Sequence, residues 1–195
     1  MPRRKHTFAV GEYYHCYNRG TDKRVIFNDK QDYNYFIKSV VAYNSFETLG
    51  KLRLQQNVLS EQQLVEVVSY CLLPNHYHMV LKEKTEGGIS KYIQRISIGY
   101  TMYYNEKHKR SGALFQGSFK SKFIETDQDL KQVISYVTYN NVVHNISNDE
   151  LFRSKLNLQA EIVRDPISNF PSESQMMEVV NIIKEQRLSF DNTNQ

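Results

Sequence analysis

Two histidines separated by one residue carry the clearest chemical potential in this sequence. His76 and His78 stand in the segment His76-Tyr77-His78-Met79-Val80. Side chains alternate along a β-strand, so both imidazoles would project from one face of a strand at this place. Two neighbouring imidazoles can bind a divalent metal. The spacing alone is weak evidence, since two partly exposed histidines on an open sheet would give the same pattern.

A second pair, Tyr136 and Asn140, is four residues apart and would share one face of a helix. The ordinary pKa of a phenol is about 10, so Tyr136 is a poor nucleophile unless helped, and a metal that polarises a phosphate oxygen would reduce that demand. The amide oxygen of Asn140 is a candidate third metal ligand. Packing alone would also explain the pair, with Tyr136 at the edge of the core and Asn140 at the helix end. Tyr139 is a rival nucleophile.

Charge and aromatic content are compatible with a nucleic-acid partner. The 195 residues carry a net charge of +4 with a sequence pI of about 8.9, and they include 14 tyrosines and no tryptophan. Basic clusters at residues 107–110 and 120–122 flank Phe115 and Phe119. Cations neutralise phosphates and aromatic rings stack on unpaired bases, a combination that suits single strands. A solvated charged face would give the same composition.

Other signals narrow the class of protein. Cys16 and Cys71 lie in apolar, strand-like surroundings without metal-ligand spacing, which predicts buried reduced thiols. The chain has no apolar run long enough for a membrane span and no signal-peptide pattern after Met1, so we expect a cytoplasmic protein without a membrane partner. Phosphate loops and serine elbows are also missing from the sequence.

The elements that must position the histidines and Tyr136 follow from apolar periodicity and turn residues. Helices are predicted from Asn28 and Asp29 onward, from Ile89 to Glu106, from Asp127 to about Val142, and from Ser174 to Arg187. Predicted strands cover residues 13–20, 65–72, 76–82 and 119–125, and residues 50–60 form a loop. This order predicts an α+β fold, an antiparallel sheet with helices packed on one face.

Four segments follow one another in a distinctive order. The first strand ends in Asn18-Arg19-Gly20, and Leu73-Pro74-Asn75 precedes the histidine pair. The other two segments are Leu114-Phe115-Gln116-Gly117-Ser118-Phe119-Lys120-Ser121 and Tyr136-Val137-Thr138-Tyr139-Asn140-Asn141-Val142. Together they resemble the single-tyrosine HUH transposases of insertion sequences, in particular the REP-associated tyrosine transposase branch. Ser118 stands where the family usually has arginine, and Asn141 stands where it usually has proline. Neither change touches the chemical groups.

The resemblance implies a ferredoxin-like fold and a catalytic domain at residues 1–145, with a C-terminal extension at 146–195. It implies that His76, His78 and Asn140 bind Mg²⁺ or Mn²⁺, of which Mn²⁺ suits imidazole ligands better. Tyr136 would then cleave single-stranded DNA through a 5′-phosphotyrosine and rejoin it, at hairpin-containing element ends. The side chains expected to contact DNA are Arg19, Lys109, Arg110, Phe115, Gln116, Lys120 and Lys122.

Three questions stay open at the level of sequence. A replication or mobilisation nickase could use the same site, although the chain carries no helicase or primase segment. A non-catalytic single-strand-binding module could use a similar sheet with incidental histidines. The site could lie within one chain or be shared between the subunits of a homodimer.

Overall fold

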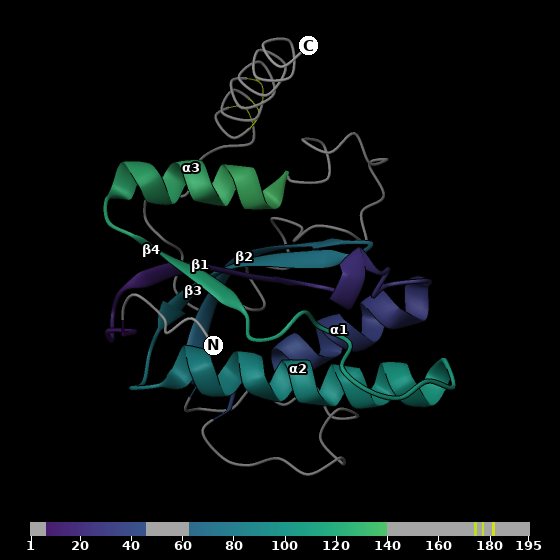
Figure 1. Ribbon diagram of the computed structural model, residues 1–195. Helices are drawn as coiled ribbons and strands as arrows, with labels where there is room; N and C mark the ends of the chain where they lie inside the picture. Colours follow the sequence, from purple (N-terminus) through teal and green to yellow (C-terminus); the bar gives the residue numbers. More distant parts are fainter. Residues whose placement is uncertain (1–6, 46–62, 140–173, 175–176, 178–180, 182–195) are drawn as a thin grey trace.

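The computed structural model describes residues 7–45 and 63–139, together with Ser174, Met177 and Asn181 (Figure 1). The elements are β1 (Tyr13–Arg19), a 3-10 turn η1 (Thr21–Lys23), α1 (Lys30–Ala42), β2 (Val65–Leu73), β3 (His76–Glu83), α2 (Gly88–Lys107), β4 (Lys120–Ile124) and α3 (Asp127–Thr138). The predicted strands and helices are all present within these ranges, and Ser174, Met177 and Asn181 are helical as expected. The predicted loop at 50–60 and the domain boundary at 145 lie outside the described residues.

The four strands form one antiparallel sheet in the order β2-β3-β1-β4. With the chain order β1-α1-β2-β3-α2-β4, this is the ferredoxin-like topology. The predicted α+β class and antiparallel sheet are therefore confirmed. β1 and β3 are the central strands, whereas β2 and β4 form the two edges.

The sequence predicts helices on one face of the sheet, whereas the structure has helices on both faces. Helices α1 and α2 share one face, and α3 covers the other, so the molecule has three layers (Figure 1). Alternation along the strands explains the division. Tyr77 and Met79 point into the larger core with α1 and α2, while Val80 and Cys71 point into the smaller core under α3.

Helix α3 is fixed at its start and along one side. The hydroxyl of Thr126 accepts a hydrogen bond from the backbone N–H of Asp129, which caps the helix N-terminus. Leu130, Ile134 and Val137 then bury the apolar stripe against the sheet, as their spacing predicts. This anchoring sets the height and rotation at which Tyr136 meets the strands.

A buried carboxylate ties the start of α1 to the end of α2. Asp32 is fully buried and pairs with Lys107 Nζ at 2.8 Å and with His108 Nε2 at 3.2 Å. It also accepts the backbone N–H of Asn28 at 2.8 Å. Charged groups are tolerated in an interior when they are paired in this way.

A second buried carboxylate caps α2. Glu83, at the end of β3, accepts the backbone N–H groups of Gly88 at 3.0 Å and Ile89 at 2.7 Å. These groups have no partner inside the helix, and the positive end of the helix dipole favours the anion. Burial nevertheless raises the pKa of the Glu83 carboxyl above its ordinary value.

The remaining sequence predictions concern thiols and membranes. Cys16 and Cys71 are buried free thiols, as predicted. In the part of the chain that the structure describes, no helix combines the length and the apolar character that a membrane span requires.

Candidate active site

The pairing of β1 with β3 assembles the candidate site. Tyr17 lies directly opposite His78, and Arg19 lies opposite His76. Residues paired across an antiparallel ladder share a face of the sheet. His15, two residues before Tyr17, therefore joins the same face, so the two central strands present their polar side chains together.

The two histidines are adjacent and held at right angles. The ring centroids of His76 and His78 are 5.1 Å apart with an interplanar angle of 81°. His76 Nδ1 lies 2.6 Å from Asn75 Oδ1, and His78 Nδ1 lies 2.9 Å from His15 Nε2. Since Nδ1 is engaged with the protein in both rings, Nε2 is the nitrogen that would ligate a metal. The donor set thus fits a divalent transition metal at this face.

Burial favours the neutral form of His15. Desolvation by burial, with a smaller contribution from the Lys122 ammonium, lowers the pKa of His15 to about 4. Lys122 lies directly opposite His15 on β4. A second cation beside Lys122 is disfavoured, so at neutral pH His15 is an uncharged hydrogen-bonding group.

Helix α3 brings Tyr136 to the same place. Its ring centroid lies 5.8 Å from that of His78 and 6.1 Å from that of His15, with both pairs edge to face. Tyr136 is half-buried, whereas the rival Tyr139 is 3% exposed and packs in the core under α3. Of the two phenols, Tyr136 is therefore the one placed to meet a substrate at the histidines.

The described side chains leave the ligand set incomplete. Within residues 7–45 and 63–139, no group of three His, Cys, Asp or Glu side chains is arranged to hold a metal ion. Asn140, the predicted third ligand, lies just outside the described residues. An amide oxygen or a substrate oxygen would have to complete the coordination begun by His76 and His78.

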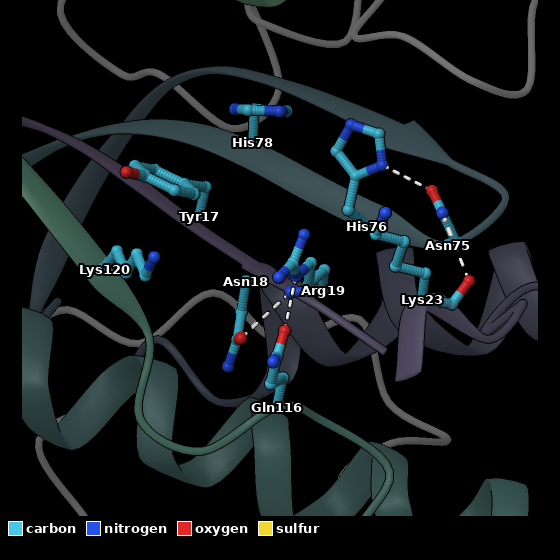
Figure 2. Close-up of a pocket in the computed structure, with 9 residues that line it drawn as sticks. All are labelled: Tyr17, Asn18, Arg19, Lys23, Asn75, His76, His78, Gln116 and Lys120. Carbon is cyan, nitrogen blue, oxygen red and sulfur yellow. Dashed lines mark hydrogen bonds between the residues drawn. The ribbon is translucent and has the colours of Figure 1, made fainter. Parts of the chain in front are cut away.

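A cavity of about 710 Å³ opens beside the histidine pair (Figure 2). It has three cationic side chains, and no Asp or Glu is among the described residues that line it. A pocket with this charge attracts anions, phosphates among them. The lining residues are Tyr17, Asn18, Arg19, Lys23, Asn75, His76, His78, Gln116 and Lys120.

The segment at 114–117 is fastened to the end of β1 and forms one wall of this pocket. Gly20 and Phe115 form an isolated antiparallel bridge, and Gln116 N–H donates to the Arg19 carbonyl at 2.8 Å. The Arg19 guanidinium in turn donates to Gln116 Oε1 (Figure 2). Asn18 Nδ2 holds the Gly117 carbonyl at 3.2 Å. These bonds explain why two segments far apart in sequence present one polar surface.

The residues predicted to contact DNA divide into two groups. Arg19, Gln116 and Lys120 line the pocket, and Lys122 lies on the same sheet face beside His15. Lys109 and Arg110 follow α2 and do not line the pocket.

Arg110 and Phe115, both predicted to contact DNA, make contacts within the protein. Arg110 bonds Asn105 Oδ1 at 2.5 Å and the Ala113 carbonyl at 3.1 Å, so it braces the turn after α2. Phe115 is a correction to the sequence-based expectation. It is 6% exposed and packs against Tyr77 and Tyr100, because the bridge at Gly20 turns its ring inward. It therefore anchors the loop instead of stacking on a base.

Several residues of the candidate site escaped the sequence-based prediction. His15 and Tyr17 carry the same i, i+2 spacing as His76 and His78, but their relevance depends on the pairing of β1 with β3. Asn75 lies in the quoted Leu-Pro-Asn segment and was given no role. Lys23 reaches the pocket through a turn in which Asp22 and Lys23 have φ values of 56° and 60°. Such left-handed conformations are uncommon for non-glycine residues, and nothing local in the sequence signals them.

Comparisons with known proteins found one matching family and several similar solved structures. The family model described as "Transposase IS200 like" matches residues 13–140. Among solved structures, the chain is similar to a REP-associated tyrosine transposase bound to a REP hairpin, with 15% identity and a TM-score of 0.60. That alignment covers 90% of this chain and 96% of the other. A bacterial tRNA(His) guanylyltransferase-like protein in complex with GTP follows, with 9% identity and a TM-score of 0.44 over 72% of this chain and 66% of the other. No curated protein sequence matches the chain.

Proposed function

Because this chain belongs to the IS200-like transposase family, we propose that it cleaves and rejoins single-stranded DNA with Tyr136 as the nucleophile. One observation carries the proposal. The ring of Tyr136, on α3, stands 5.8 Å, centroid to centroid, from the ring of His78, on β3. Family membership supports DNA strand transfer in general, and this juxtaposition supports the roles proposed for Tyr136 and His78.

The Tyr136 oxygen attacks the phosphorus of a DNA phosphodiester, and the bond from phosphorus to the 3′ oxygen breaks. The phenolic proton leaves to solvent, and the departing 3′ oxygen takes up a proton. The products are a 5′-phosphotyrosine and a free 3′-hydroxyl. Attack by a 3′-hydroxyl of another strand reverses these changes and joins new ends with no external energy source, because each step exchanges one phosphodiester bond for another.

His76 and His78 would hold a divalent cation through their Nε2 atoms, and the amide oxygen of Asn140 is proposed as a further ligand. A bound Mn²⁺ or Mg²⁺ supplies Lewis-acid polarisation of a phosphate oxygen. Imidazole ligands favour Mn²⁺ over Mg²⁺ on grounds of ligand type. Asn75 Oδ1 and His15 Nε2 lie within hydrogen-bond distance of the Nδ1 atoms of His76 and His78.

The substrate is proposed to be a strand that carries a hairpin. The solved transposase that this chain is similar to is bound to a REP hairpin, and the family relationship supports a related substrate here. Arg19, Lys23 and Lys120 surround the pocket and would neutralise phosphates of the strand entering the site. The Tyr17 ring, 5.6 Å from that of His78, offers a surface on which a base could stack.

The test uses Tyr136→Phe and a 3′-labelled oligonucleotide with a hairpin, incubated with Mn²⁺ and resolved on a denaturing gel. The wild type should form a labelled covalent adduct, and Tyr136→Phe should form none while still binding the oligonucleotide. Tyr139→Phe is the matched control and should retain the adduct, since the Tyr139 ring is buried. Unchanged adduct formation in Tyr136→Phe would refute the assignment.

Of the two alternative functions, the same assay separates the first from a transposase and leaves the second to be judged on other grounds. A non-catalytic single-strand-binding module would bind DNA equally well with a chelator and form no adduct. A replication or mobilisation nickase would form the adduct, but its physiological partner would be a replicon. The match of residues 13–140 to the IS200-like transposase family model favours the transposase assignment.

A further inference from the structure

His15, on β1, is hydrogen-bonded to His78, a histidine of the proposed metal site. We infer that His15 is a positioning residue that fixes the tautomer and the orientation of His78, so that His78 presents an unprotonated Nε2 to the metal. The inference rests on the proposed metal role of His76 and His78. Its physical basis is the contact between His15 Nε2 and His78 Nδ1, at 2.9 Å.

The contact admits one proton arrangement that allows metal binding. A nitrogen–nitrogen hydrogen bond needs one N–H and one lone pair. If His78 Nδ1 donates to His15 Nε2, then His78 Nε2 carries a lone pair and can ligate. If His15 Nε2 donates instead, the remaining proton of neutral His78 sits on Nε2 and blocks the metal. His15 must therefore accept, which places its own proton on Nδ1.

The surroundings of His15 favour this arrangement. Its ring is stacked on His78, with centroids 5.1 Å apart at 25°, and it also contacts the rings of Tyr17 and Tyr136. Lys122 lies directly opposite it on β4. These neighbours hold the His15 ring in place, with its Nε2 directed at His78 Nδ1.

His76 has an equivalent partner. Asn75 Oδ1 is an acceptor only, so the 2.6 Å contact requires a proton on His76 Nδ1. Asn75 Nδ2 also donates to the Lys23 carbonyl at 3.3 Å, which fixes the amide orientation. Both proposed ligands are thus held in the same tautomer, one by an amide and one by His15. Outer partners of this kind tune affinity at metal sites.

The experiment compares His15→Gln with His15→Leu. Glutamine can place an amide oxygen near the position of Nε2 and so preserves the acceptor, whereas leucine fills the space without one. Mn²⁺ binding is measured by calorimetry and by the loss of the free-ion electron paramagnetic resonance signal. His15→Leu should weaken Mn²⁺ binding by about 10- to 100-fold, and His15→Gln by no more than about threefold.

His108→Leu is the matched control, because it removes a histidine that bonds Asp32 far along the chain from the site. It should leave the Mn²⁺ affinity unchanged. Circular dichroism confirms that each variant is folded. An unchanged affinity in His15→Leu, or equal losses in the Leu and Gln variants, would overturn the inference.

A metal-free readout separates this inference from the proposed function. Imidazole ¹⁵N chemical shifts report which ring nitrogen carries the proton. His78 should be protonated at Nδ1 in the wild type and in His15→Gln, and should shift toward the Nε2-protonated form in His15→Leu. Mn²⁺ binding that is lost in His78→Ala but intact in His15→Leu would leave the metal site standing and refute the role of His15. Absence of Mn²⁺ binding in the wild type would refute the metal site and this inference together.

Discussion

Removing two pocket lysines should flatten the salt dependence of DNA binding by a calculable amount. Lys23 and Lys120 line the pocket beside the histidines, and neither is paired with a carboxylate among the pocket-lining residues described. Each phosphate that a cation neutralises releases condensed counterions, so a plot of log K against log salt steepens by about 0.7 per contact on single strands. The double variant Lys23→Ala/Lys120→Ala should therefore lower the slope by about 1.4. Arg19 is left in place because it also bonds Gln116.

The slope converts to a measurable difference in affinity. Between about 50 and about 200 mM salt, a slope change of about 1.4 means that the wild type loses about sevenfold more affinity than the double variant. Fluorescence anisotropy with a labelled hairpin-bearing oligonucleotide measures both slopes. Lys38→Ala/Lys84→Ala is the charge-matched control, since both lysines are exposed and do not line the pocket. Equal slopes for wild type and pocket variant, or an equal change in the control, would refute the proposed phosphate contacts.

Three further outcomes follow from the described contacts. A mixture of the Tyr136→Phe and His78→Ala variant proteins should form no covalent adduct with DNA, because the two rings meet within one chain. An adduct recovered on a denaturing gel would show that the site is shared between subunits. Lys107→Met should lower the free energy of unfolding, measured by urea denaturation, by about 3 kcal/mol, because it leaves the buried Asp32 carboxylate with weaker partners. An unchanged urea midpoint would contradict this prediction. Burial raises the pKa of Glu83, so the folded chain binds this proton more tightly than the unfolded chain does. The stability of the wild type relative to Glu83→Gln should therefore fall as the pH rises from below the ordinary pKa of a glutamate through the raised pKa of Glu83. A pH-independent difference in stability would refute this prediction.

Much of the local structure could be predicted from the sequence because its signals are local. Asp29 and Thr126 cap their helices as their residue types predict, and the apolar stripe of α3 is buried at Leu130, Ile134 and Val137. The alternation at His76 and His78 also places both rings on one face. Periodicity and capping depend on residues within a few positions, so one sequence is enough to recognise them.

The parts that escaped prediction depend on contacts between distant segments. Nothing near His15 indicates that β1 pairs with β3 in the register that sets Tyr17 opposite His78. The burial of Phe115 follows from its bridge to Gly20, almost a hundred residues earlier in the chain. The position of α3 on the far face likewise follows from strand faces that become defined only once the sheet is assembled.

The edge position of β4 gives Lys120 and Lys122 a second consequence. An exposed edge strand offers unpaired backbone groups to another sheet, and short length and lysine side chains are common safeguards against such pairing. β4 has five residues, and among the described strands it pairs with β1 alone. Lys120 and Lys122 therefore also protect the folded chain from edge-to-edge aggregation. The DNA contact proposed for these lysines and the protection of the sheet edge depend on the same two positions, so neutral residues there would favour aggregation even in a chain that no longer bound DNA.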